Sequence, residues 1–305
     1  MMVQTESTSD TRGRLAAVGA YVLWGLLPVY WKAIEHVPAI EILGHRMVWS
    51  LVFTLLLLSL RTQWTWLKDI RTHPKRYLTF IASAIILGVN WFTYIFAVNS
   101  GHIVEASLGY FINPLFSVVL GVVFLRERLR ILQWVAVGIA LAGVVYLTYH
   151  YGHFPWIALT LAFTFGMYGL LRKTAPLTSL PGLSLEMMLL FVPAVVFLVS
   201  LEIRGSGHFG HYSVPTDILL IITGVATAMP LLLFAYGAKR IRLATIGILQ
   251  YIAPTLQFLI GVFVYNEVFT TARFVGFCFI WVALGLYTVE GFIYRRNRAI
   301  PPPLR

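Results

Sequence analysis

The chain has 305 residues, of which 59% are hydrophobic and 11% charged, with a formal net charge of +11. Soluble proteins carry roughly 25% charged residues, so this composition excludes an ordinary soluble fold and requires lipid as part of the solvent. The single cysteine, Cys278, excludes a disulfide framework and a cysteine-based metal site. The basic residues lie in short loops between apolar runs, so the net charge does not indicate nucleic acid binding.

Ten apolar runs follow one another along the chain, and a helix of about 20 residues is enough to cross a bilayer. We predict an all-α integral membrane protein whose transmembrane helices lie near 15–34, 38–60, 77–98, 103–125, 131–150, 154–172, 181–202, 216–238, 243–265 and 271–293. The first run follows two arginines, as in a signal peptide, but it is long enough to span and lacks a convincing small-residue cleavage site. We therefore interpret it as a retained helix.

The two chain ends are polar. The head 1–14 is expected to be disordered and cytoplasmic, and 295–305 is a basic, proline-rich tail expected on the same side and disordered beyond Arg298.

Loop charge predicts the orientation of the helices. With ten spans, nineteen lysines and arginines fall on the side of the N-terminus, whereas the outer loops hold only Arg204. Because positive residues accumulate on the cytoplasmic side, both termini are predicted to be cytoplasmic. The expected location is the cell inner membrane.

The second half of the chain repeats the first. Residues 88–147 align with 228–287 at a constant offset of 140, which places Pro114 on Pro254. Upstream, Gly25 and Lys32 match Gly166 and Lys173 at an offset of 141. Each proline removes a helix hydrogen bond, so we predict a kink at both positions, which is either functional or a passive packing feature.

Charge in corresponding loops indicates that the two copies are inverted. Asn99, Ser100 and His102 align with Lys239, Arg240 and Arg242, so the basic residues have changed sides. Five spans per copy is an odd number, which requires this exchange. We predict two five-helix repeats, 15–150 and 154–294, with opposite orientation, an arrangement typical of transporters.

Several stretches resemble the EamA-type drug/metabolite transporter superfamily, and in particular its RarD branch of chloramphenicol-sensitive proteins. They are YVLWGLLPVYWK (Tyr21–Lys32), EILGHRMVWS (Glu41–Ser50), NWFTYIFAVN (Asn90–Asn99), ASLGYFINP (Ala106–Pro114), FGMYGLLRK (Phe165–Lys173) and QYIAP (Gln250–Pro254). The resemblance covers roughly 15–294 and implies a ten-helix permease. It also implies a chloramphenicol-related phenotype, but no physiological substrate.

Polar residues inside apolar helices are costly, so they indicate functional sites by default. The candidates for the substrate pathway are Arg46, His45, Asn90, Trp91, Tyr94, Tyr110, Asn113, Tyr168, Gln250, Gln257 and Trp24. Arg46 is suited to bidentate contact with a carboxylate or a nitro-like oxygen pair. The alternative for Asn90, Asn113 and Gln250 is hydrogen bonding between helices.

The candidates for proton coupling or gating are Glu41, His45, Glu105 and Lys32. Glu41 and His45 are one helical turn apart and share a face. The alternative is structural, with Glu41, His45 and Arg46 paired to Glu105 or Lys32 to hold the bundle together. Glu127 lies among three arginines and is interpreted as a solvated ion pair.

These patterns favour a secondary transporter that moves a small organic solute by alternating access, with export favoured over import by the resemblance. No P-loop, HExxH or clustered aspartate motif is present, so we predict neither an enzyme nor a metal or cofactor site. The expected partners are the bilayer and the solute, and the sequence does not indicate an oligomeric state. A non-transporting sensor or chaperone and an intramembrane enzyme are the alternatives.

Overall fold

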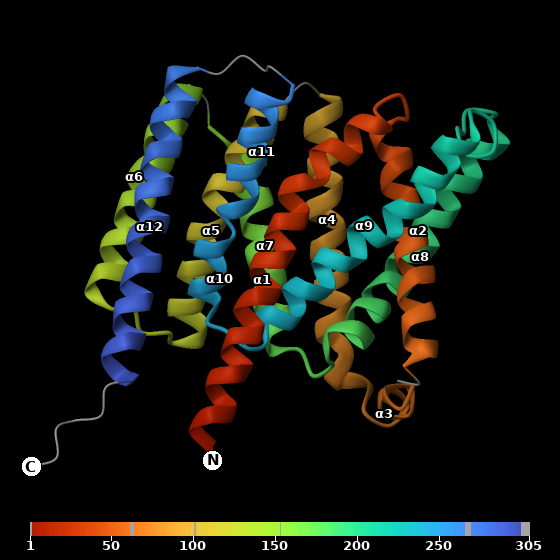
Figure 1. Ribbon diagram of the computed structural model, residues 1–305. Helices are drawn as coiled ribbons and strands as arrows, with labels where there is room; N and C mark the ends of the chain where they lie inside the picture. The colour runs from red at the N-terminus through yellow and green to blue at the C-terminus, as the bar shows by residue number, and fades with distance from the viewer. Residues whose placement is uncertain (1, 62–63, 101, 153, 266–269, 300–305) are drawn as a thin grey trace, which may run out of the picture.

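The computed structural model describes residues 2–61, 64–100, 102–152, 154–265 and 270–299, and all its regular elements in these ranges are helices (Figure 1). They are α1 (Met2–Ala33), α2 (Ala39–Leu60), α3 (Trp66–Thr72), η1 (Pro74–Tyr77), α4 (Leu78–Asn99), α5 (Ile103–Leu125), α6 (Ile131–Tyr151), α7 (Trp156–Thr174), α8 (Ser179–Ile203), α9 (Val214–Ala238), α10 (Leu243–Leu249), α11 (Ile252–Phe263) and α12 (Thr271–Ala299). The all-α prediction is confirmed.

Nine segments in the described part of the chain are long and apolar enough to cross a membrane. The remaining predicted span corresponds to α7, which carries Arg172 and Lys173 in its last turn and is not among the nine. Large apolar side chains also lie exposed along the outside of α2, α5, α6, α8 and α12. A surface of this kind requires lipid contact, so the chain is a multi-pass membrane protein.

Two helices extend beyond the predicted spans. α1 begins at Met2 and so includes most of the predicted head 1–14. No proline interrupts this segment, and each residue added to an existing helix forms one more hydrogen bond. α12 likewise continues to Ala299, while the last six residues of the predicted tail lie outside the described ranges.

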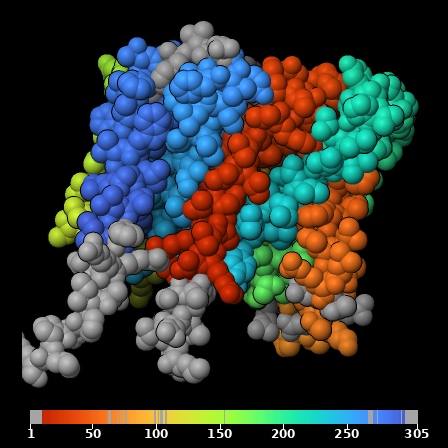
Figure 2. Space-filling model, in the orientation of Figure 1, coloured from red at the N-terminus to blue at the C-terminus, as the bar shows by residue number. Residues whose placement is uncertain are grey.

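The helices form one bundle, in which the start of α1 and the end of α12 lie at the same end (Figure 1). The most extensive packing joins α5 with α7, α6 with α12, α9 with α1 and α2, and α2 with α8. α1 crosses the front face between α9 and the group α10–α12 (Figure 2).

The two repeated prolines behave differently. The predicted span 243–265 is divided at Gln250 and Tyr251 into α10 and α11. Pro254 has no N–H to donate to the carbonyl of Gln250, which removes the hydrogen bond that would continue the helix. Pro114, by contrast, lies within the continuous helix α5.

α2 and α9 cross at very short distance, and this crossing positions the site described below. A Cβ atom added to Gly224 would lie 2.3 Å from the carbonyl carbon of Trp49. The hydroxyl of Ser50 donates to the carbonyl oxygen of Gly224 at 3.2 Å. Arg46 lies one turn before Ser50 in α2, and Thr227 lies one turn after Gly224 in α9.

Two carboxylates in the bundle lie at the starts of helices, where the first N–H groups have no partner within the helix. The oxygens of Glu127 accept from the N–H groups of Leu243 and Ala244 at 2.7 and 2.9 Å. Glu105 accepts from the N–H of Ile157 at 2.7 Å and from the hydroxyl of Tyr151 at 3.0 Å. The interpretation of Glu127 as a solvated ion pair is therefore wrong, because its oxygens cap α10.

A fully buried ion pair joins α4, α7 and α8. The carboxylate of Glu186 accepts from the hydroxyls of Ser83 at 2.5 Å and Tyr168 at 3.1 Å, and lies 3.5 Å from Nη1 of Arg172. Arg172 also donates to the carbonyl of Ser179 at 3.0 Å. Every charge in this cluster has a partner, so removing one member exposes the others to an apolar interior.

Replacing Gly224 with alanine should lower the thermal unfolding midpoint in detergent, because the methyl group would collide with the backbone of α2. Overpacking of this kind costs about 1–3 kcal/mol. Gly285→Ala is the matched control, since its Cβ would meet no atom within 4 Å. Equal midpoints for the two variants would contradict the close crossing.

Replacing only Glu186 with leucine, or only Arg172 with methionine, should destabilise the protein by about 3–5 kcal/mol, because each leaves a buried charge unpaired. The double variant removes both charges and should be less damaging than either single variant. Thermal unfolding of the three variants measures this. Additive losses in the double variant would mean that the two side chains are not a pair.

Candidate functional site

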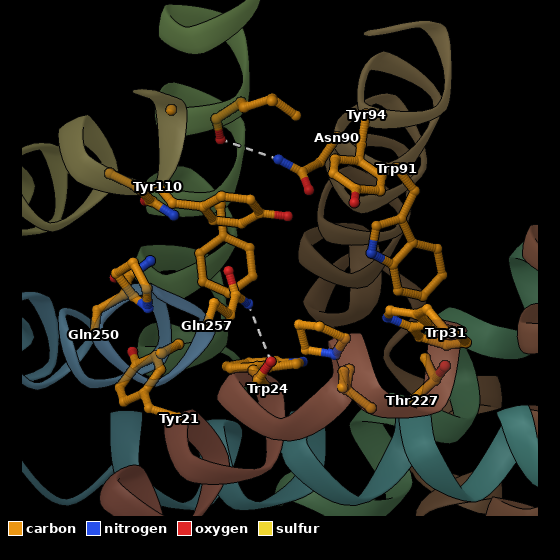
Figure 3. Close-up of a pocket in the computed structure, with 18 of the residues that line it drawn as sticks. Tyr21, Trp24, Trp31, Asn90, Trp91, Tyr94, Tyr110, Thr227, Gln250 and Gln257 are labelled. Carbon is orange, nitrogen blue, oxygen red and sulfur yellow. Dashed lines mark hydrogen bonds between the residues drawn. The ribbon is translucent and has the colours of Figure 1, made fainter. Parts of the chain in front are cut away.

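A cavity of about 450 Å³ opens between α1, α2, α4, α5, α7, α9, α11 and the break between α10 and α11 (Figure 3). Its lining includes Tyr21, Trp24, Pro28, Trp31, Lys32, Glu35, Arg46, Asn90, Trp91, Tyr94, Tyr110, Asn113, Phe165, Thr227, Leu231, Gln250, Pro254 and Gln257. Lys32 and Glu35 have side chains 54% and 59% exposed, which places the mouth at the C-terminal end of α1. Tyr21 lies roughly 16 Å deeper, at 1.5 Å of rise per residue.

Arg46 is held between two aromatic rings. Its guanidinium carbon lies 5.1 Å from the ring centre of Trp31 and 5.0 Å from that of Trp91. Its Nε donates to the hydroxyl of Thr227 at 2.9 Å. Within the described chain no carboxylate pairs with Arg46. Stacking and one hydrogen bond therefore fix the orientation of a guanidinium that still offers its two terminal nitrogens to an oxygen pair.

The amide side chains divide into two groups. Asn90 donates to the carbonyl of Leu161 at 3.0 Å and to the hydroxyl of Thr164 at 2.8 Å, and thus joins α4 to α7. Gln257 donates to the carbonyl of Trp24 at 3.1 Å. These contacts match the structural alternative, hydrogen bonding between helices. Asn113 and Gln250 differ, since each has a buried side-chain oxygen with no hydrogen-bond partner in the described chain.

Nine of the eleven predicted substrate-pathway residues line this cavity, and His45 and Tyr168 do not. His45 is adjacent to Arg46, and successive helical residues point about 100° apart because one turn takes 3.6 residues. Nδ1 of His45 accepts from Trp49 at 3.3 Å, and its ring packs on Phe209 in the loop before α9. Tyr168 instead donates to the carboxylate of Glu186.

Of the coupling or gating candidates, Lys32 lines the cavity, whereas Glu41, His45 and Glu105 do not. Glu41 accepts from the backbone N–H of His208 at 2.7 Å and lies 2.8 Å from Nδ1 of the same residue. Glu41 and His45 do share a helix face, but that face meets the loop between α8 and α9.

Sequence reasoning missed part of the lining. Tyr21, Pro28 and Trp31 line the cavity beside Trp24 at spacings of three and four residues along α1, and Glu35 continues this spacing in the turn after it. This spacing places residues on one helix face, so the sequence alone could have predicted that they line the cavity together with Trp24. Thr227 carried no such signal, because one hydroxyl in an apolar span is common.

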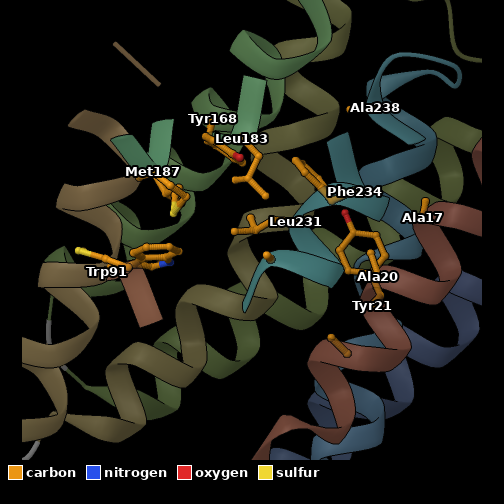
Figure 4. Packing of buried hydrophobic residues seen from close by; sticks show 14 of the residues in the cluster. Ala17, Ala20, Tyr21, Trp91, Tyr168, Leu183, Met187, Leu231, Phe234 and Ala238 are labelled. Carbon is orange, nitrogen blue, oxygen red and sulfur yellow. The ribbon is translucent and has the colours of Figure 1, made fainter. Parts of the chain in front are cut away.

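A buried cluster extends from the cavity lining at Trp91 and Leu231 to Ala17 and Ala238, toward the end of the bundle where α1 starts (Figure 4). The ring of Phe234 stacks on Tyr168 with centres 6.0 Å apart and meets the edge of Tyr21 at 6.4 Å. Ala17, Ala20 and Ala238 fill the space around these rings. The cavity therefore opens at one end of the bundle and is sealed at the other.

The arrangement can bind a small organic solute that presents oxygen acceptors to Arg46 and a flat apolar body to the aromatic rings. No group of His, Cys, Asp and Glu suited to a metal ion occurs among the described residues.

Comparison with known proteins gives consistent results. The model of the EamA-like transporter family matches residues 11–149. The chain is 46% identical to the uncharacterized transporter YojE of Bacillus subtilis, over 93% of this chain and 96% of that protein. It is 43% identical to Protein RarD of Escherichia coli, over 96% of this chain and 99% of that protein.

A solved structure described as "Crystal structure of protein" shares the fold, with a TM-score of 0.71 at 17% identity, over 92% of this chain and 98% of that one. The two relatives and this structure each match nearly the whole chain. The chain belongs to the EamA-like transporter family, in the group that includes RarD.

Proposed function

We propose that this chain is a secondary transporter that exports a small organic solute across the cell inner membrane by alternating access. The solute binds in the cavity beneath the mouth formed by Lys32 and Glu35, with its oxygen acceptors at Arg46. The observation that carries this proposal is an uncompensated guanidinium fixed between two tryptophans in an aromatic cavity. A charge inside a membrane protein is costly unless it serves such a purpose.

The proposal includes ten spans with both termini in the cytoplasm, built as inverted repeats 15–150 and 154–294. Two observations support it: the loop charges, and the position of the start of α1 and the end of α12 at one end of the bundle. In this orientation the cavity faces outward and its sealed end faces the cytoplasm.

Transport would draw on the proton or solute gradient, since the sequence contains no nucleotide-binding motif. Glu41, His45, Glu105 and Lys32 are proposed to couple or gate this process. The first three act through loops and helix ends, because their side chains lie outside the cavity.

A second proposal is a sensor or chaperone that binds the solute without moving it. The unpaired oxygens of Asn113 and Gln250 suit either role. Metabolite and drug profiles of cells with and without the chain, with chloramphenicol included, separate the two. A solute whose distribution depends on the chain supports transport, and unchanged profiles despite solute binding favour the sensor.

Arg46→Gln should weaken binding of phenylacetate to the purified protein by about ten- to a hundredfold, because hydrogen bonds to charged groups contribute about 1.5–3 kcal/mol. Binding of the uncharged phenylacetamide should change little. Titration calorimetry of both ligands gives the preference directly.

His45→Ala is the matched control, since His45 is next to Arg46 in α2 but outside the cavity. It should keep the preference for the carboxylate. If Arg46→Gln keeps the preference as well, Arg46 is not the solute contact.

A further inference from the structure

Two lysines cross-link the cytoplasmic ends of α7 and α9. Lys173, in the last turn of α7, donates from Nζ to the carbonyl of Ala238 at 3.1 Å and to the carbonyl of Ile241. Lys239, which follows α9, donates from Nζ to the carbonyl of Ala175 at 2.5 Å. The last carbonyls of a helix have no partner within it and form its negative end. Each helix therefore places a cation on the end of the other.

These contacts lie directly beyond the seal of the cavity. Ala238, whose carbonyl accepts from Lys173, is fully buried in the same cluster as Tyr21 and Phe234 (Figure 4). Separating α7 from α9 at this end would break the lysine contacts and open the cluster. The lysines thus hold the sealed end closed.

At the opposite end of the bundle, the lysine that corresponds to Lys173 in the repeat is exposed. In the repeat alignment Lys32 corresponds to Lys173, so α1 corresponds to α7 and α4 to α9. Trp31 of α1 and Trp91 of α4 line the cavity between these helices. Lys32 lies exposed at the mouth, with Nζ 2.6 Å from Glu35.

We propose that Lys173 and Lys32 are matched gate residues that cap helix ends alternately. In the conformation described, Lys173 caps α9 and the inner end is closed, while the outer end is open. In the opposite conformation Lys32 caps the C-terminal end of α4, where Val98 corresponds to Ala238, and Lys173 is released. This inference rests on the proposed transport function and on the inverted repeat.

The charges around both lysines suit this exchange. Lys32 forms an exposed ion pair with Glu35, and pairs of this kind contribute little to stability. At the inner end Lys239 adds a second cap, and its counterpart in the alignment is Asn99, which is uncharged. Two caps inside against one outside favour the inner-closed conformation, which is the one the structure has.

The test measures access to the cavity without any solute. In a Cys278→Ser background, Leu27→Cys places one thiol in the cavity lining, and a membrane-impermeant methanethiosulfonate is added from the outer face of right-side-out vesicles. Lys173→Gln should slow modification about tenfold, since it removes hydrogen bonds from a charged group that act only in the inner-closed state. Lys32→Gln should not slow it, and the double variant should return toward the starting rate.

Lys173→Arg is the conservative control, because it keeps the charge and should keep most of the starting rate. An unchanged rate in Lys173→Gln, or equal slowing by both glutamine variants, overturns the gate assignment. A tenfold shift in access combined with no flux of any solute would uphold the gate and contradict transport. Solute flux that is the same in Lys173→Gln, in Lys32→Gln and in the wild-type chain would uphold transport and contradict the gate.

Discussion

The fold depends on the need of every buried backbone group for a hydrogen-bond partner in surroundings without water. Helices satisfy their interiors but leave four N–H groups and four carbonyls open at their ends. In this protein charged side chains close several of those ends: Glu105 on α7, Glu127 on α10, Lys173 on α9 and Lys239 beyond α7. These charged groups are all satisfied by backbone atoms, whereas Arg46 pairs with no described carboxylate and lines the cavity.

The same constraint connects packing with function. The close crossing of α2 and α9 at Gly224 places Arg46 against Thr227. Trp31 of α1 and Trp91 of α4 then hold the guanidinium between their rings. Bonds at helix ends can be exchanged when helices tilt, whereas bonds inside helices cannot. A bundle sealed through its helix ends can therefore change which end is open without unfolding any span.

Sequence reasoning located the helices because apolar length is imposed by the bilayer, and it found most of the cavity because polar groups in lipid are costly. It did not predict that Arg46 lines the cavity while His45 does not. The two residues are adjacent in α2, and sequence alone does not show which face of the helix points into the cavity. It also overlooked Glu186 in an apolar run, whose partners Ser83, Tyr168 and Arg172 come from other parts of the chain. Pro114 and Pro254 both lack the N–H, yet only Pro254 follows a break in its helix, so the local pattern alone does not predict the difference.

The central claim is that the cavity carries a solute across the membrane. The most direct measurement is flux in proteoliposomes that contain the purified chain, with a solute selected from the cellular profiles. If the cavity carries the solute, flux should saturate, depend on a proton or solute gradient and be lost in Arg46→Gln with the protein still folded. Gradient-dependent flux that is equal in liposomes with the wild-type chain and with Arg46→Gln would contradict it.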